Sequence, residues 1–508
     1  MTTLLFSEAA VPAFQGRERE LPVRTATQEA SKRRHTLASR LVFVTICVTI
    51  VMTTLAFGTV HYWALAAFTA IAAALVCLWC LDGLTLHSVQ LSRNALQWPL
   101  AGMIVLGLVQ LLPLRAPDDT AGLQLSLSRA LSLDPNSTRL VLVQLLSLLI
   151  FFSATLIFTD SPRRLRALTR TIIIFGFLLA MFGVTQSLTS NGTRIYWYRQ
   201  LTQSTGFGPF INRHHFAGYM ELVIGLPLGL LFSGSLEAHK RPLYAFAGLL
   251  MAVALILTTS RGGIISLVAE ILFIVVVAAP GVKYSEQSRK GALMRTVLWR
   301  AAMAFGLVLI LFFGGLAAGG PGVFDRLLGT VNLADPTTGR AHFWDVTLDV
   351  IKNHPVLGSG LGSFGVIYTR YDSRNGLYRL EQAHNDYLQT LADGGIVGGL
   401  LGLSFLIILF RGGFARRLTS DKFRSGVATG ALAGCFAVLV HSAFDFTLHT
   451  TANALLFLVL AAMATLDRRV DEGTTHRRRR RRRGSTATVT ESETASAEAP
   501  GLRQPKPA

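Results

Sequence analysis

Residues 381–410, EQAHNDYLQTLADGGIVGGLLGLSFLIILF, change from polar to apolar along their length. The first part contains a histidine, an asparagine and acidic residues, and the part from Ile396 onward suits only a lipid environment. An apolar run of this kind predicts a helix that crosses a bilayer. The stretch therefore predicts that His384 lies at the lip of a membrane-spanning helix.

The composition of the whole chain indicates a membrane protein. The 508 residues are 51% hydrophobic and only 15% charged, whereas soluble chains contain about 25% charged residues. The net charge of +19 comes from basic residues in short connections and in the two tails, as expected of cytoplasmic segments. An arginine run at 477–483 follows the last apolar segment. We expect this run to meet anionic membrane lipid rather than nucleic acid.

Apolar runs of about 16 to 21 residues recur along the chain, long enough to cross a hydrocarbon core as helices. They predict an all-α polytopic membrane protein with about twelve transmembrane helices and a large outer loop that contains short helices. Spans one to nine fall within 39–318, the loop covers 319–395, and spans ten to twelve fall within 396–467. The predicted spans lie near 41–60, 62–81, 98–114, 139–158, 171–188, 217–234, 243–259, 264–280, 301–318, 396–410, 426–442 and 453–467.

The distribution of lysine and arginine predicts the orientation of the spans. Alternate connections are rich in these residues, and the connections at 58–62 and 443–452 contain none. By the positive-inside rule, both termini are expected in the cytoplasm. Residues 1–38 and the basic segment 468–508 are predicted to be disordered cytoplasmic tails, because their composition cannot bury a core.

The loop at 319–395 exceeds 70 residues, a length that usually marks a functional segment. Within it, TTGRAHFWDVTLDVIKNHP (337–355) predicts a helix, since Trp344, Leu348 and Ile351 share one face and Pro355 stops it. The following VLGSGLGSFG is predicted to be irregular. A second helix is expected to begin near His384 and to close at Gly394-Gly395.

Five polar clusters fall on the predicted outer face, at 212–221, 258–266, Arg340, His384 and 441–453. Arg261 and Arg340 are candidates for binding a diphosphate, because guanidinium groups bind phosphate oxygens through paired hydrogen bonds. The alternatives are an Arg261 that snorkels to lipid headgroups and an Arg340 that is a solvated surface residue.

His384 is the candidate general base, because a neutral imidazole can accept a proton near neutral pH. Asn385 or Asp386 could orient it. The alternative is a helix-capping or core histidine. A metal held by His214, His215 and His384 is not expected, since neither HExxH nor another carboxylate-histidine spacing is present.

Together these motifs resemble the O-antigen ligase family of membrane glycosyltransferases, which includes O-antigen polymerases and O-oligosaccharyltransferases. The resemblance covers roughly residues 200–460. Its specific part is a pair of motifs that flank the large loop, and the remaining motifs support it. The residues that carry it are FINRHHFAGYM, TTSRGG, GRAHFWDVTLDVIKNHPVLGSGLGSF, AHNDYLQTLADGGIVG and HSAFDFTLHTTANAL.

The resemblance implies an inverting, metal-independent enzyme without a cofactor, in a bacterial inner (cytoplasmic) membrane with its active face in the periplasm. The donor would be a glycan on a polyprenyl diphosphate, and the acceptor a glycan or lipid A-core hydroxyl. Arg261 and Arg340 would bind the diphosphate, and His384 would take the proton of the acceptor. The resemblance also assigns substrate binding to a further set of residues: Asn212, Arg213, His215, Trp344 and Asn385.

One position departs from the family pattern, because His214 stands where the family often has asparagine. The sequence does not separate a ligase from a polymerase of the same family. A ligase is our first hypothesis, and a polymerase is the alternative. A twelve-span transporter is another, with Glu270 as the clearest mid-span charge. A scaffold that recruits partners through its basic tail is the third.

Overall fold

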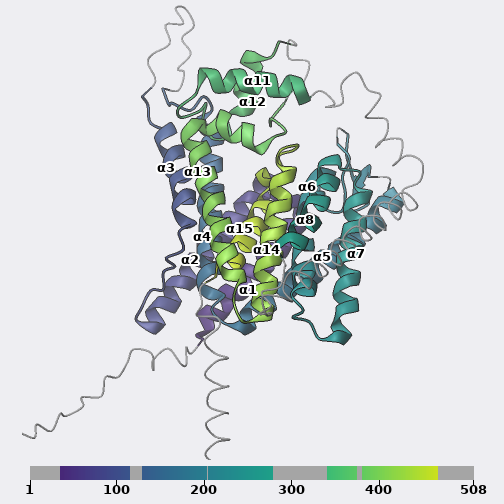
Figure 1. Ribbon diagram of the computed structural model, residues 1–508. Coiled ribbons are helices and arrows are strands. Elements are labelled where there is room, and N and C mark those ends of the chain that lie inside the picture. Colours follow the sequence, from purple (N-terminus) through teal and green to yellow (C-terminus); the bar gives the residue numbers. More distant parts are fainter. Residues whose placement is uncertain are drawn as a thin grey trace, which may run out of the picture. The chain divides into compact units, whose positions relative to one another are not determined.

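The computed structural model describes residues 35–114, 129–190, 192–202, 204–277, 340–373 and 380–466. Outside these residues lie the predicted ninth span, parts of the large loop, and both tails except residues 35–38. The described residues are almost entirely helical (Figure 1). In them, two short strands, β1 (Arg194–Ile195) and β2 (Arg199–Gln200), pair antiparallel.

Eleven of the twelve predicted spans correspond to helices. Those before the large loop are α1 (Leu37–Leu55), α2 (Tyr62–Leu86), α3 (Gln97–Gln110), α4 (Pro135–Phe158), α5 (Pro162–Ser190), α6 (Arg213–Phe232), α7 (Arg241–Leu257) and α8 (Arg261–Val277). Those after it are α13 (Asp386–Arg417), α14 (Lys422–His441) and α15 (Thr451–Thr465). Within the described residues, 8 helices are long and apolar enough to cross a membrane. The all-α polytopic membrane architecture is thus confirmed, whereas the number of twelve spans stays a prediction.

Helix α5 differs from its predicted boundaries, because it begins at Pro162 rather than near residue 171. Its first turns contain arginines that were expected in a cytoplasmic connection. Arg164 is buried there and donates to the carbonyl oxygen of Ser39 at 3.0 Å and to its Oγ at 2.8 Å. An apolar run marks only the lipid-facing part of a helix, so it misses a polar first turn that packs against a neighbouring helix.

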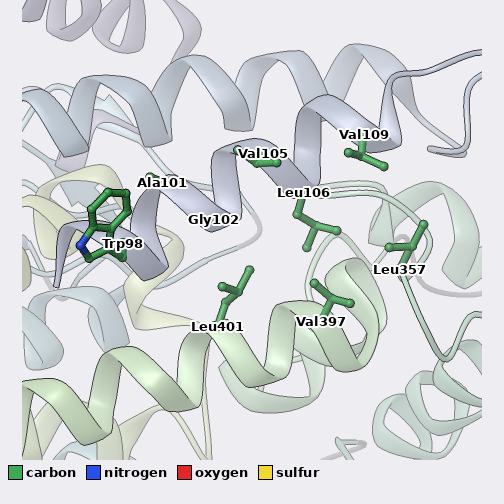
Figure 2. A pocket seen from close by; sticks show the side chains of 9 residues that line it. All are labelled: Trp98, Ala101, Gly102, Val105, Leu106, Val109, Leu357, Val397 and Leu401. Carbon is green, nitrogen blue, oxygen red and sulfur yellow. The ribbon is translucent and has the colours of Figure 1, made fainter. Parts of the chain in front are cut away.

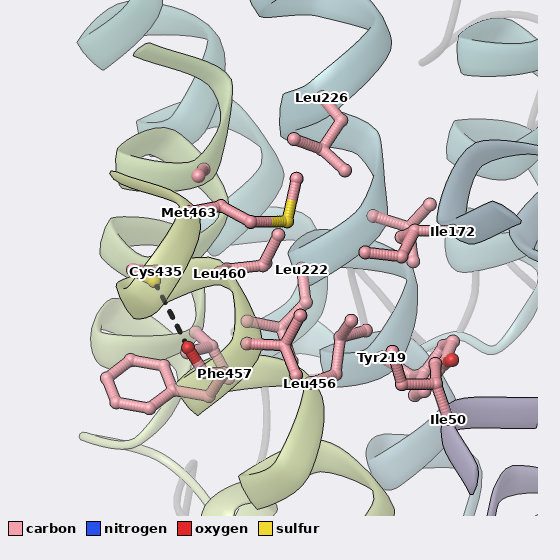
Figure 3. Close-up of a cluster of buried hydrophobic side chains, with 14 of the residues drawn as sticks. Ile50, Ile172, Tyr219, Leu222, Leu226, Cys435, Leu456, Phe457, Leu460 and Met463 are labelled. Atoms are coloured by element: carbon pink, nitrogen blue, oxygen red, sulfur yellow. Dashed lines mark hydrogen bonds between the residues drawn. The ribbon is translucent and has the colours of Figure 1, made fainter. Parts of the chain in front are cut away.

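Among the described helices that are long enough to cross a membrane, α6 and α14 are the most buried. A Cβ atom on Gly225 of α6 would lie 2.2 Å from the carbonyl oxygen of Gly430 in α14. Small residues of this kind allow two membrane helices to approach closely. Figure 3 shows the apolar core beside them, where the Cys435 thiol of α14 meets the carbonyl oxygen of Phe457 in α15 at 3.8 Å.

Two short helices of the large loop, α11 (Arg340–Asn353) and α12 (Phe364–Tyr371), lie at the end of the bundle where α13 begins (Figure 1). Helix α11 confirms the helix predicted before Pro355, and α12 was not predicted. The two helices share a small core with the start of α13, made of Val346, Val350, Phe364, Ile367, Tyr368, Leu380, Ala383 and Ala392.

The prediction of a second helix that begins near His384 and closes at Gly394-Gly395 is confirmed. The segment labelled α13 consists of two helices joined at a kink, because Gly395 has the non-helical angles φ 60° and ψ −161°. A Cβ atom at Gly395 would lie 2.3 Å from the carbonyl oxygen of Val356. Only glycine adopts this backbone conformation readily, so Gly395 ends the first helix against the loop, and the membrane-spanning helix follows it.

An apolar cavity of about 500 Å³ lies between α3 and α13 (Figure 2). No ionisable side chain contributes to it, so the cavity cannot perform acid–base chemistry. It is lined by Trp98, Ala101, Gly102, Val105, Leu106, Val109, Leu357, Val397 and Leu401.

Candidate active site

Three segments that are far apart in sequence meet at the carboxylate of Asp445, which lies in the connection between α14 and α15. The side chain of Asp445 is only 1% exposed. Its Oδ1 lies 3.2 Å from Nδ1 of His384, and its Oδ2 accepts a hydrogen bond from the Arg340 guanidinium at 3.3 Å. The two residues assigned by sequence to base and diphosphate binding thus share one buried anion.

The Asp445 carboxylate stays ionised in this environment. Burial acts to raise its pKa, but the hydrogen bond from His384 and the electrostatic interactions with His214, His384 and Arg340 outweigh burial. They hold the pKa of Asp445 well below its usual range. The backbone N–H of Phe446 also donates to Oδ1 at 2.9 Å. A fixed negative charge is therefore available to orient the imidazole of His384.

His384 precedes α13 and adopts a left-handed backbone conformation, with φ 52°. This conformation is uncommon for a residue with a side chain and often occurs at functional sites. The ring of His384 meets Phe446 edge-on at 4.8 Å and lies 6.1 Å from the Phe343 ring. Its side chain is 25% exposed, so the ring is held in place and remains accessible to a substrate.

Asn385, expected to bind substrate, has a structural role in the described contacts. Its side-chain oxygen caps α13 by accepting from the backbone N–H groups of Tyr387 and Leu388 at 3.0 and 3.1 Å. Its amide donates to the carbonyl oxygen of Ala443 at 3.0 Å. Asn385 therefore ties the start of α13 to the segment that contains Asp445.

A second link joins the same two segments. The two carboxylate oxygens of Asp386 lie 2.7 Å from His449 Nδ1 and 2.7 Å from Ser442 Oγ. Burial acts to lower the pKa of His449, but the hydrogen bond and charge of Asp386 outweigh it, and the pKa is raised. These contacts fix His384 relative to Asp445.

The start of α6 approaches Asp445 from the other side. Asn212 caps α6 by accepting from the backbone N–H of His214 at 2.9 Å, and Arg213 donates to Thr259 Oγ1 at 2.9 Å. His214 Nδ1 lies 3.7 Å from Asp445 Oδ2. His215 Nδ1 lies 2.9 Å from Thr450 Oγ1. The 212–215 cluster thus borders the site, and its contacts include a helix cap.

Arg261 and Trp344 are placed less directly. Arg261 is the first residue of α8 and follows Ser260, whose Oγ lies 2.8 Å from His214 Nδ1. The start of α8 therefore borders the site. Trp344 lies on α11, and its indole Nε1 is buried without a hydrogen-bond partner in the described part of the chain.

Sequence reasoning did not single out Asp445, His441 or Glu221. His441 Nδ1 lies 2.8 Å from Glu221 Oε1, with both side chains fully buried, and His441 Nε2 lies 3.4 Å from Ser260 Oγ. Both motifs that contain these residues had been recognised as polar clusters. The sequence could not rank their members, because the contacts join residues about 180 to 220 positions apart.

His214, His441 and Asp445 present ligand atoms within 4.8 Å of one another, a spacing that can hold a metal ion. These atoms already have protein partners, however. A cation would have to displace or compete with Arg340 and His384 at the carboxylate, so the charges of the site suit an anionic ligand better.

Two comparisons with known proteins show what the chain is similar to. Residues 246–403 match the family model described as O-antigen ligase, which confirms the family resemblance. The matched range contains Arg261, Arg340 and His384, and Asp445 lies beyond it. The chain is also similar to the exopolysaccharide production protein ExoQ of Rhizobium meliloti (strain 1021). The two are 22% identical over 319 residues, which cover 60% of this chain and 67% of the relative.

Proposed function

We propose that this protein is an inverting membrane glycosyltransferase that moves a glycan from a polyprenyl-diphosphate donor to an acceptor hydroxyl, most similar in role to an O-antigen ligase. The family match supports a part in polysaccharide assembly. The single observation that carries the proposal is the meeting of Arg340 and His384 at the buried carboxylate of Asp445.

His384 acts as the general base. When its Nδ1–H donates to Asp445, the lone pair of Nε2 is left to accept a proton. The acceptor oxygen attacks the anomeric carbon as its proton passes to Nε2. The Asp445 carboxylate stabilises the imidazolium that forms, as in other pairs of histidine and aspartate.

Arg340 and Arg261 bind the diphosphate. A guanidinium has five N–H donors, so Arg340 can hold Asp445 and still donate to phosphoryl oxygens. As the bond between the anomeric carbon and the phosphate oxygen breaks, the leaving diphosphate takes the electron pair. The fixed positive charges stabilise the negative charge that develops there. Arg213, His215 and Trp344 are assigned to substrate binding around this centre.

An exopolysaccharide polymerase of the same family is the second candidate, favoured by the similarity to a protein of exopolysaccharide production. The two activities share a leaving group and differ in the acceptor. A ligase uses a glycan such as a lipid A-core sugar, and a polymerase uses another lipid-linked repeat. Deleting the gene and separating surface polysaccharide on gels distinguishes them, because loss of a ligase leaves long unligated chains and loss of a polymerase leaves single repeats.

We place the protein in the bacterial inner membrane, with both termini cytoplasmic and the active face periplasmic. The basic C-terminal tail would lie on anionic lipid, and no nucleic acid is expected as a partner. Neither a metal nor a cofactor is required by the proposed chemistry, since the base and the diphosphate-binding groups all belong to the chain.

The test is transfer of a labelled glycan from a polyprenyl-diphosphate donor by the purified protein in lipid vesicles. His384→Ala and Arg340→Ala are expected to yield inserted, folded protein without transfer. His239→Ala, which changes an exposed histidine outside the site, is the matched control and should transfer normally. Normal transfer by both site variants would refute the proposal, and solute flux without transfer would favour a transporter.

A further inference from the structure

A chain of buried polar side chains connects the interior of the bundle to the active site. It runs from Glu221 Oε1 to His441 Nδ1 at 2.8 Å, from His441 Nε2 to Ser260 Oγ at 3.4 Å, and from Ser260 Oγ to His214 Nδ1 at 2.8 Å. Glu221, His441 and Ser260 have no exposed surface. His214 is the exception, with a side chain that is 21% exposed at the edge of the site.

The charge of the Glu221–His441 pair decides which atom of the chain carries each hydrogen. With one hydrogen shared among the Glu221 carboxyl group and the two ring nitrogens of His441, the pair has a net charge of −1. With two hydrogens on these groups, the pair is neutral. A buried net charge inside a membrane bundle is costly. Glu270 of α8 and Asp445 add further carboxyl groups that interact with the pair, and Arg340 interacts with His441. The neutral pair is therefore favoured.

In the neutral pair, His441 Nε2 carries a hydrogen whichever way the second proton is shared with Glu221. Nε2–H then donates to Ser260 Oγ, which also accepts from the backbone N–H of Gly263 at 3.2 Å. With both of its acceptor positions in use, the Ser260 hydroxyl donates its own hydrogen to His214 Nδ1. His214 must then carry its hydrogen on Nε2.

Asp445 Oδ2 lies 3.7 Å from the same His214 nitrogen, beyond hydrogen-bond distance. Its negative charge would favour a hydrogen on Nδ1, but Arg340 and His384 already hold that carboxylate. Ser260 is the closer partner of His214, and its hydrogen is directed to Nδ1.

We propose that Glu221, His441 and Ser260 hold His214 in the Nε2–H tautomer, and that His214 donates this hydrogen bond to a phosphoryl oxygen of the donor diphosphate. This inference rests on the proposed function, and it assigns a binding role to His214, the position that departs from the family pattern. An asparagine amide at this position would donate an N–H whatever the charge of its neighbours, whereas a histidine needs its tautomer fixed.

The experiment is a double-mutant cycle between Ser260→Ala and His214→Asn, read as kcat/KM for the donor in lipid vesicles. His214→Leu should reduce kcat/KM about tenfold or more, as expected for a lost hydrogen bond to a charged group. His214→Asn should restore most of this loss. Ser260→Ala should cost about tenfold in the wild-type background and much less in the His214→Asn background. His239→Asn, an exposed histidine, is the matched control.

Equal losses from Ser260→Ala in both backgrounds would overturn the inference, because they would show that Ser260 acts only by capping α8. A direct measurement is independent of activity. Nitrogen-15 NMR of the histidine-labelled protein is expected to show the His214 hydrogen on Nε2, and a hydrogen on Nδ1 would refute the proposal. If the wild-type protein transferred no glycan, the proposed function would fail, and the NMR result would still test the tautomer.

Discussion

Replacing Asp445 with asparagine tests the centre of the site directly. The substitution preserves the shape of the side chain and removes its charge. His384 and Arg340 both lose a charged hydrogen-bond partner, at 3.2 and 3.3 Å. Asparagine can also donate its amide hydrogen to His384 Nδ1, which would place the imidazole hydrogen on Nε2 and block the base.

The magnitude follows from these contacts. A hydrogen bond to a charged group contributes about 1.5–3 kcal/mol, so losing two would cost about 3–6 kcal/mol if both act in the transition state. At about 1.4 kcal/mol for each factor of ten, Asp445→Asn should lower kcat/KM about 10²- to 10⁴-fold. The fold should persist, because the His384 and Arg340 side chains are about one quarter exposed and can be hydrated.

The assay is glycan transfer by the purified variant in vesicles, with insertion and thermal unfolding measured in parallel. Asp160→Asn is the matched control, since Asp160 pairs with Arg164 at 3.5 Å away from the site. The pKa of Asp445 is lower in the folded protein than in the unfolded chain. The stabilisation from its negative charge is therefore present at any pH above the pKa of the unfolded chain, and it is lost only as the pH falls through the pKa of the folded protein. The activity ratio of wild type to variant should therefore not change through titration of Asp445 between about pH 5 and 8. A folded Asp445→Asn protein within threefold of wild-type activity would refute our account of the base.

Two further predictions concern the structure that positions the site. Gly395→Ala should lower the unfolding temperature in detergent, because the new Cβ atom would lie 2.3 Å from the carbonyl oxygen of Val356 at a φ of 60°. Gly402→Ala is the control and should not lower it, because nothing lies within 4 Å of a Cβ atom there. Equal effects of the two substitutions would contradict the assigned strain. The pKa of His449 is higher in the folded protein than in the unfolded chain. Its pairing with Asp386 therefore stabilises the fold fully at a pH below the pKa of the unfolded chain, and this stabilisation is lost as the pH rises through the pKa of the folded protein. The unfolding temperature of the wild type should therefore fall more steeply than that of His449→Gln as the pH rises above about 6.5. Parallel curves would show that this pair does not contribute.

The sequence was sufficient to identify the class of protein and most of its helices. In lipid, a long apolar run must form a helix so that its backbone N–H and C=O groups are hydrogen-bonded. The spans, and the position of His384 at the lip of one of them, could therefore be predicted directly. Arginine chemistry likewise identified Arg340 as a candidate for an anionic ligand. The break at Gly395 could be predicted as well, because paired glycines mark a helix end. The start of α5 could not, because its polar first turns are stabilised by packing against a neighbouring helix.

The tertiary structure alone identified Asp445 as the shared partner of Arg340 and His384, and Ser260 as the link to His441. A carboxylate or hydroxyl in a loop has no sequence signal that names its partner, because the contact forms only when distant helices pack. Local propensity and hydrophobicity therefore determined what crosses the membrane. The packing of α6, α8, α13 and α14 determined which polar groups meet at its edge.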